Sequence, residues 1–263
     1  YIFSSKERDF SEREKNTPQP SIEISNISLS FSLLKAYFDC PYSFKFFSFY
    51  GFQQPLGAKM GYGSSIHNSL MELHREYLEG KLYNKEDLAD LVGVHAYFPY
   101  STELVSKELT NKAIDSVEVY YDNNVKEFQD IEFAEKDIQI DLGDGIIVVG
   151  SMDLIKKKNM DGTFEKTIID FKSTEDAQAY NASIDQLKLY ALGYKALTGE
   201  DADFLQIYNL DENESFKSEI YNKDLDAMKS KIIKAANSIR SNDLDNTCND
   251  PKCVCRFKEI KED

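Results

Sequence analysis

Residues 131–172 constrain the fold of this chain more than any other stretch. Apolar and polar residues alternate from Ile131 to Leu142, and the alternation resumes from Ile146 to Lys157 after the turn Gly143-Asp144-Gly145. A two-residue period predicts half-buried strands, and the short glycine-containing turn between them predicts a β-hairpin. Phe164 to Lys172 is predicted as a third strand. The centre of the fold is therefore expected to be a sheet.

The third strand carries a carboxylate and an ammonium group two residues apart. Because residues i and i+2 of a strand share a face, Asp170 and Lys172 are expected to point into one site. Ile169 and Phe171 then anchor the opposite face. An antiparallel second strand would place Asp153 beside Asp170. Close carboxylates repel unless a cation lies between them, so this set predicts Mg²⁺ or Mn²⁺ and a phosphodiester substrate.

Helices are predicted on both sides of these strands. The predicted helical regions are 30–50 with a break at Pro41, 65–78, a short stretch after Asn84, 102–124, 183–197 and 223–241, and further strands are predicted at 204–210 and 216–221. A β-meander followed by a crossover helix and another strand predicts an α/β fold, a mixed β-sheet flanked by helices.

Two local features of the helical regions carry expectations of their own. Nine aromatic residues lie between positions 31 and 50, and such a stripe is more often core than a surface on which bases stack. Gly57, Gly61 and Gly63 are expected to form a turn before the helix predicted at 65–78.

The chain of 263 residues is expected to form one main domain. Residues 1–20 are polar and highly charged and end in Thr17-Pro18-Gln19-Pro20, which is typical of a linker within a longer protein. The predicted boundaries are a linker at 1–28 and a domain at 29–263, with a helical part at 29–128, an α/β core at 129–221, and a C-terminal helix and Cys-rich tail at 222–263. No apolar run approaches the roughly 20 residues of a membrane span, so a cytoplasmic protein without membrane contact is expected.

The formal charge of −15 argues against a nucleic-acid partner, because phosphate backbones normally bind surfaces rich in Lys and Arg. A binding groove needs only local cations, however, and the ligands of a metal ion add to the acidic count when the ion is left out. A neighbouring basic domain could also supply affinity for DNA.

Four short patterns follow one another along the chain, and together they are far more specific than any one alone. They are Gly-x-x-x-His at Gly63/His67, Gly-x-x-Asp at Gly150/Asp153, Asp-x-Lys at Asp170/Lys172 and Gln-x-x-x-Tyr at Gln186/Tyr190. In this order they resemble the PD-(D/E)XK nuclease superfamily, specifically its RecB-like branch, over about residues 29–255. The resemblance implies a restriction-endonuclease-like fold.

The resemblance also implies roles for individual residues. It assigns the divalent metal to His67, Asp153, Asp170 and the main-chain carbonyl of Phe171. Lys172 is expected to position or activate the attacking water, and Gln186 and Tyr190 to support the site and contact the DNA strand. Without the resemblance, a lone histidine on an apolar helix such as His67, His74 or His95 is more often a core residue.

The chain has only four cysteines, one near the N-terminus and three near the C-terminus: Cys40, Cys248, Cys253 and Cys255. Four thiols divided in this way suit a [4Fe-4S] cluster that joins the N-terminal helices to the C-terminal tail. The arrangement resembles the iron-sulfur subset of the family, which includes AddB-like nuclease domains and the nuclease tails of UvrD-like helicases. Zn²⁺ bound by four thiolates and four reduced thiols without a cluster remain alternatives.

The resemblance therefore predicts a metal-dependent DNA exonuclease that acts on single strands or duplex ends, in repair or recombination, beside a helicase domain or subunit. A non-catalytic DNA-binding or scaffold domain of the same fold is the alternative. A hydrolase that uses the carboxylates as acid and base without metal is disfavoured, because nothing in the sequence is seen to raise the pKa of either Asp without a cation.

Overall fold

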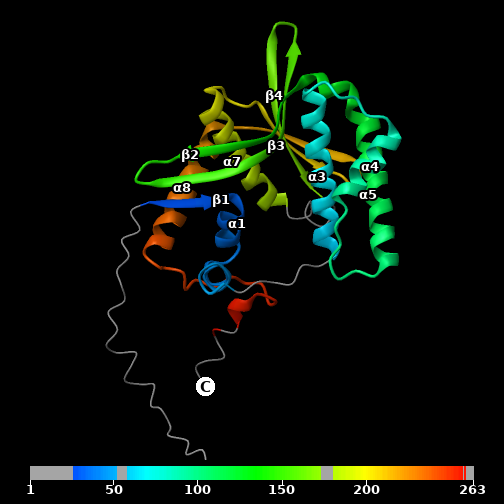
Figure 1. Cartoon of the computed structure of the whole chain (residues 1–263). Coiled ribbons are helices and arrows are strands. Elements are labelled where there is room, and N and C mark those ends of the chain that lie inside the picture. The colour runs from blue at the N-terminus through cyan, green and yellow to red at the C-terminus, as the bar shows by residue number, and fades with distance from the viewer. Residues whose placement is uncertain (1–25, 52–57, 173–179, 257, 259–263) are drawn as a thin grey trace, which may run out of the picture.

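The computed structural model describes residues 26–51, 58–172, 180–256 and 258. Residues 1–25 of the linker predicted at 1–28, and Gly57, lie outside these residues. A six-stranded mixed sheet forms the centre (Figure 1), with the strands in the order β1-β3-β4-β5-β6 and β2 paired with β3. The strands are β1 (Ile27–Ser30), β2 (Ile131–Asp141), β3 (Ile146–Met160), β4 (Thr163–Lys172), β5 (Phe204–Asn209) and β6 (Glu214–Glu219).

The predicted hairpin and third strand are confirmed. β2 pairs antiparallel with β3, β3 pairs antiparallel with β4, and β4 runs parallel to β5 after the crossover helix. Strand β1 was not predicted. It is only four residues long, begins two residues before the expected domain boundary, and runs parallel to the start of β3, with Ile27 opposite Ile146.

The first helical region is divided as predicted at Pro41. Helix α1 (Phe31–Asp39) begins at Ser30, whose hydroxyl accepts a hydrogen bond from the N–H of Leu33. Cys40 then adopts an extended conformation, and the short helix α2 (Pro41–Phe44) continues into the π-helix η1 (Lys45–Phe49). The turn between α1 and α2 is what positions the thiol of Cys40.

The expected turn at Gly61 and Gly63 is wrong, because both lie inside helix α3 (Ala58–Leu78). At Gly61 the helix approaches another segment too closely for a side chain: an added Cβ would lie 2.5 Å from the carbonyl oxygen of Tyr97. Packing, rather than a turn, explains that glycine.

The other predicted helices are present. They are α4 (Lys85–His95), α5 (Glu103–Asn124), α7 (Tyr180–Thr198) and α8 (Asn222–Arg240), and a 3-10 segment η2 (Val125–Asp130) leads into β2. Asn84 and Asp87 form a reciprocal capping box at the start of α4.

A membrane-spanning helix must be both long and apolar, and none of the described helices meets both conditions.

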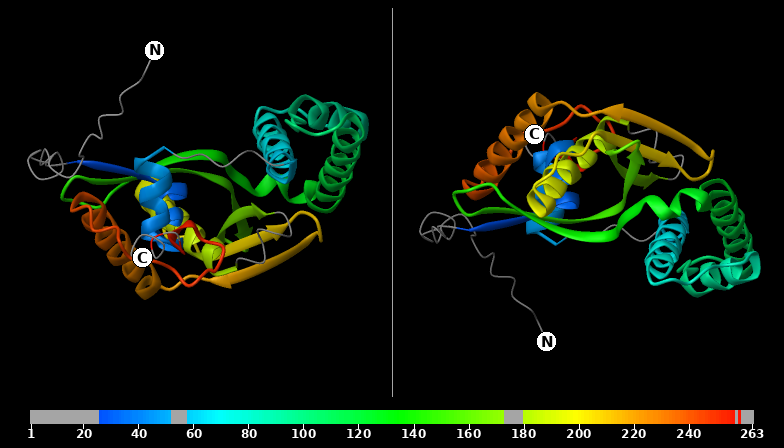
Figure 2. Two further views of the ribbon diagram at one scale, coloured as in Figure 1. Left: turned by 90° about the horizontal axis from the view of Figure 1, so that it is seen from below. Right: turned by 90° about the horizontal axis from the view of Figure 1, so that it is seen from above.

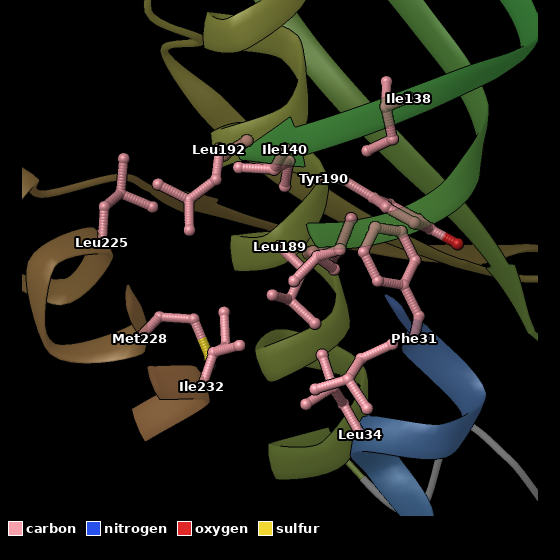
Figure 3. Packing of buried hydrophobic residues seen from close by; sticks show 14 of the residues in the cluster. Phe31, Leu34, Ile138, Ile140, Leu189, Tyr190, Leu192, Leu225, Met228 and Ile232 are labelled. Atoms are coloured by element: carbon pink, nitrogen blue, oxygen red, sulfur yellow. The ribbon is translucent and has the colours of Figure 1, made fainter. Parts of the chain in front are cut away.

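Alternating residues of the sheet contribute to two cores. Ile168 packs in a core with α1, α7 and α8, whereas Ile169 and Phe171 pack in a second core with α3, α4 and α5. Figure 2 shows the two groups of helices on either side of the sheet, and Figure 3 shows the first core, with Phe31 of α1 beside Leu189 of α7. The aromatic stripe is therefore partly core, as expected, although Phe49 and Tyr50 remain exposed.

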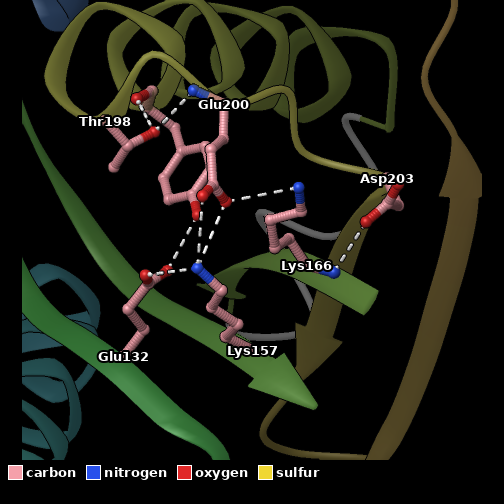
Figure 4. Close-up of polar contacts among 7 residues, drawn as sticks. Glu132, Lys157, Lys166, Thr198, Glu200 and Asp203 are labelled. Carbon is pink, nitrogen blue, oxygen red and sulfur yellow. Dashed lines mark hydrogen bonds and ion pairs between the residues drawn. The ribbon is translucent and has the colours of Figure 1, made fainter. Parts of the chain in front are cut away.

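A polar network holds the C-terminal end of α7 against the strands (Figure 4). The hydroxyl of Tyr194 donates to Glu132 of β2 at 2.8 Å. Lys157 of β3 lies 3.5 Å from Glu132 and 3.2 Å from Glu200, and Lys166 of β4 lies 3.4 Å from Glu200. The network helps to fix the helix that carries Gln186 and Tyr190.

Candidate active site

The register of the sheet brings two carboxylates together. β3 pairs with β4 so that Leu154 lies opposite Ile169, and the next position places Asp153 beside Asp170, as predicted. Both carboxylates are buried, Asp170 completely. One oxygen of Asp153 accepts a hydrogen bond from the N–H of Phe171 at 3.1 Å, which orients that carboxylate.

Lys172 connects the strand to the crossover helix. Its Nζ donates to Oδ1 of Asp170 at 3.1 Å and to Oε1 of Gln186 at 3.2 Å. The amide nitrogen of Gln186 in turn donates to the hydroxyl of Tyr190 at 2.5 Å. The structure thus places the predicted residues of β4 and α7 in one continuous hydrogen-bonded chain.

Helix α3 brings His67 to the same place. Its Nε2 lies 3.3 Å from Oδ1 of Asp153 and 3.4 Å from Oε1 of Glu135. Ile66 and Leu70 are buried, and His67, the residue after Ile66, reaches the carboxylates from the neighbouring part of the helix surface. His74 and His95 do not join this site.

Glu135 is the site residue that the sequence analysis missed. The β2–β3 register pairs Ala134 with Leu154 and Lys136 with Met152, so Glu135 falls opposite Asp153. Ser151 donates to its second oxygen at 3.1 Å. The signal in the sequence was the first hairpin, because pairing its strands about the turn at residues 143–145 places Glu135 opposite Asp153. Its φ of 45° was not predictable from the alternating pattern.

Burial and charge shift the pKa values of these groups. Burial, together with the negative charge of Asp153, raises the pKa of Asp170 to about 7, although Lys172 acts in the opposite direction. The expectation that nothing raises the pKa of either Asp is therefore wrong for Asp170. Burial likewise raises the pKa of Glu135. Burial alone would lower the pKa of His67, but its hydrogen bond to Asp153 and the nearby carboxylates raise it to about 9.

The donor set fits a divalent cation. Ligand atoms of His67, Glu135 and Asp153 all lie within 4.8 Å of one another. Oδ2 of Asp170 is buried and has no hydrogen-bond partner within the described part of the chain, although Nζ of Lys172 lies 2.9 Å away. An imidazole beside clustered carboxylates, whose negative charges repel one another, is a set that Mg²⁺ or Mn²⁺ would stabilise. The carbonyl of Phe171 as a further ligand stays a prediction.

Gly150 shows why the Gly-x-x-Asp pattern needs a glycine in this chain. A Cβ at this position would lie 2.2 Å from the ring of Phe31. That ring packs against Tyr190, with the two ring centroids 4.9 Å apart. The glycine therefore leaves room for the aromatic ring that packs against α7.

The four cysteines form a second cluster, as predicted. The sulfur atoms of Cys40, Cys248, Cys253 and Cys255 all lie within 4.8 Å of one another. The tail is also held to the first helices by a hydrogen bond of 3.0 Å from the N–H of Tyr42 to the carbonyl of Asn246. Residues about 200 positions apart in the sequence are thereby brought into contact.

Comparisons with known proteins identify the family. A family model described as the PD-(D/E)XK nuclease superfamily matches residues 28–260. One solved structure, described as the crystal structure of SSO0001, aligns over 95% of this chain and 89% of that chain, with 13% identity and a TM-score of 0.42. A search of curated proteins found no match. The family match covers most of the chain, and the chain belongs to the PD-(D/E)XK nuclease superfamily.

Proposed function

We propose that this chain is a divalent-metal-dependent DNA exonuclease that hydrolyses phosphodiester bonds at single strands or duplex ends. The observation that carries the proposal is the convergence of His67, Glu135, Asp153 and Asp170, with the ammonium group of Lys172 at 2.9 Å from Asp170. An imidazole, three carboxylates and an adjacent cation form a set suited to phosphoryl chemistry.

These four side chains would hold the ion, with the carbonyl of Phe171 as a further ligand. When bound, Mg²⁺ or Mn²⁺ would lower the pKa of a coordinated water and offset charge on the phosphate oxygens. Asp153 is oriented for this task by the N–H of Phe171. Asp170 is fully buried, so bulk water would compete little with the ion for its carboxylate.

Lys172 would act on the attacking water or on the developing negative charge. Its ammonium group is held between Asp170 and Gln186, and the bond from Gln186 to Tyr190 fixes the amide in turn. We assign Gln186 and Tyr190 to positioning Lys172 and to contacting the DNA strand.

The wider context of the reaction is also part of the proposal. The order of the four motifs supports a RecB-like nuclease used in repair or recombination, in the cytoplasm, with a helicase domain or subunit as partner. The charge of −15 fits that arrangement, since a basic neighbour would supply the affinity for the DNA backbone. For the four cysteines we propose a [4Fe-4S] cluster, supported by the proximity of all four sulfur atoms, with Zn²⁺ as the alternative occupant.

The test is cleavage of end-labelled single- and double-stranded DNA by iron-replete protein, with Mg²⁺, with Mn²⁺ and with EDTA. We expect cleavage only with added metal and its loss in Lys172→Ala. Lys195→Ala is a matched control, because Lys195 lies on α7 and pairs with Asp201 at the surface. Progressive shortening of the linear strand, with a covalently closed single-stranded circle left uncut, would indicate exonuclease action.

Two outcomes would contradict the proposal. Binding of DNA by the wild-type protein without cleavage under any metal condition would support a non-catalytic DNA-binding or scaffold domain. Cleavage that persists in EDTA would support acid-base hydrolysis by the carboxylates, for which the raised pKa of Asp170 is the favouring observation.

A further inference from the structure

A cavity of about 400 Å³ opens beside the proposed active site, between α1 and α7, with α8 along its third side. Gln186 belongs to both, because it lines the cavity and also accepts the hydrogen bond from Lys172. The volume lies within the ~300–1,000 Å³ typical of small-molecule sites. A molecule in the cavity would therefore be separated from Lys172 only by the side chain of Gln186.

The inner wall of the cavity is apolar and partly flat. It consists of the rings of Phe31 and Phe38 together with Leu189. Phe31 and Leu189 are buried, and Figure 3 shows them between α1 and α7. Lys231 of α8 lies over the ring of Phe38, with its Nζ 4.0 Å from the ring centroid. A planar heterocycle would stack on the part of this ring that Lys231 leaves uncovered, because aromatic faces attract both flat rings and cations.

The rim of the cavity carries two ion pairs, which present both hydrogen-bond donors and acceptors. Lys231 pairs with Asp185 at 2.6 Å, and Lys35 pairs with Asp39 at 2.9 Å. Two ammonium groups and two carboxylates leave no net charge, so the cavity does not favour a phosphate group. The edges of nucleobases carry both donors and acceptors and suit this rim.

We propose that this cavity receives one unpaired nucleobase of the DNA strand whose backbone is being cleaved. The inference rests on the proposed nuclease function and gives it a substrate class. Bases inside a duplex are covered on both faces, so only a single strand, a frayed end or an extruded base can enter. Stacking also supplies affinity that does not depend on a basic surface, which matters for a chain with a charge of −15.

The test is a single-stranded oligonucleotide in which one abasic site is moved through the positions around the cleaved bond. We expect the abasic site to lower kcat/KM at one position by about 5- to 100-fold, the usual effect of losing one stacked base. In Phe38→Leu the intact strand is cleaved more slowly, and the abasic site at that position makes no further difference. Phe38→Trp, which retains a flat ring, keeps the effect.

Tyr37→Leu is the matched control, since Tyr37 is an aromatic residue of the same helix that does not line the cavity. It should retain the full abasic effect. The inference is overturned if no position shows the effect, or if its size is the same in Phe38→Leu as in the wild-type protein.

A second measurement separates this inference from the proposed function. Fluorescence anisotropy of the same labelled oligonucleotides in EDTA reports binding and requires no catalysis. If the wild-type protein cleaves nothing but the abasic effect on affinity appears and is lost in Phe38→Leu, the base site stands and the nuclease proposal fails. If cleavage is normal and neither assay shows the effect, the nuclease proposal stands and the base site fails.

Discussion

At the scale of single residues, the site is a balance between burial and charge around Asp170. Its carboxylate is fully buried beside Asp153, and the two negative charges are offset by Lys172, which contacts Asp170, and by His67, which contacts Asp153. The raised pKa of Asp170 and the raised pKa of His67 are two consequences of the same excess of carboxylates. Clustered pKa shifts of this kind are typical of functional sites, and a bound divalent cation would lower the pKa of both groups.

Glu135 should contribute to metal affinity. Glu135→Gln removes one carboxylate oxygen from the set that surrounds His67, so we expect Mn²⁺ affinity, measured by calorimetry, to fall by about 10-fold or more. Asp137→Asn is the matched control, because it removes one charge from the same strand at an exposed position. Equal losses of Mn²⁺ affinity in the two variants would show that Glu135 acts only through its negative charge and is not a ligand.

His74 should make stability depend on pH. Burial, helped by the charge of Lys156, lowers the pKa of His74 to about 3, below the ordinary value of 6.5. Between these two values the unfolded chain binds a proton that the native protein does not, so stability falls as pH drops below 6.5. At about pH 5 this costs about 2 kcal/mol relative to neutral pH.

The variant His74→Phe tests this value. It keeps the ring stacked against Phe171 but cannot titrate, and its lost hydrogen bond to Tyr120 costs the same at every pH. Urea denaturation at neutral pH and near pH 5 should show a smaller loss in the variant than in the wild-type protein, by about 2 kcal/mol. Identical losses would mean that His74 is protonated in the native protein.

At the scale of elements, the strands of the centre were predictable because their alternation reflects two cores on opposite faces. The same alternation correctly placed Asp153, Asp170 and Lys172, whose neighbours Ile169 and Phe171 are buried in the second core. Strand β1 was not predictable, since four residues with little periodicity depend on β3 for their hydrogen bonds. The turn predicted at Gly61 was wrong because a close contact between a helix and a neighbouring segment favours glycine as much as a turn does.

The resemblance in four motifs was needed to predict His67, Gln186 and Tyr190 as site residues, because their local patterns alone are ambiguous. A lone histidine on an apolar helix gives no sign of its partners, and the approach of α3 to β2 and β3 decides that His67 faces carboxylates whereas His74 faces aromatic rings. The contact arises from tertiary packing, which no local pattern encodes.

The position of α7 should depend on Gly193. An added Cβ would lie 2.0 Å from Cδ1 of Ile138 on β2, so Gly193→Ala should destabilise the protein by about 1–3 kcal/mol and lower kcat by displacing Gln186 and Tyr190. Ile138→Val removes that Cδ1 atom, and the double variant should recover part of both losses. Denaturation and cleavage assays measure the two effects.

Gly93→Ala is the control for this experiment. Gly93 lies in α4, and its added Cβ would meet no atom of the described residues within 4 Å. Replacing it should be neutral or stabilising by up to about 1 kcal/mol, because alanine favours the helix. If Gly193→Ala behaved in the same way, the close packing of α7 on β2 would be contradicted.

At the scale of the whole molecule, the cysteine cluster joins the two ends of the described chain. Cys40 follows α1, and the other three cysteines lie beyond α8. Lys45 and Asp245 add an ion pair at 3.2 Å between the same two segments. Since an exposed ion pair contributes little, the ligands of the cluster should provide most of this connection.

Cys40→Ser tests the connection. The thiol of Cys40 also caps α2 by accepting a hydrogen bond from the N–H of Ser43, and a serine hydroxyl preserves that cap while removing the thiolate. We expect the variant to lose bound iron and sulfide, or zinc, and its tail to be cut sooner in limited proteolysis. A wild-type protein prepared anaerobically with no metal at this site would contradict the cluster.

We propose that buried carboxylates and Lys172 form a metal-dependent phosphodiesterase centre. The most direct measurement is the rate at which a labelled single strand is cleaved at saturating Mn²⁺ by wild-type protein and by Asp170→Asn, which keeps the shape of the side chain but not its charge. We expect cleavage by the wild-type protein and a loss of about 10³-fold or more in the variant, because the ion would lose a charged ligand. Equal rates in the two proteins would contradict the proposal.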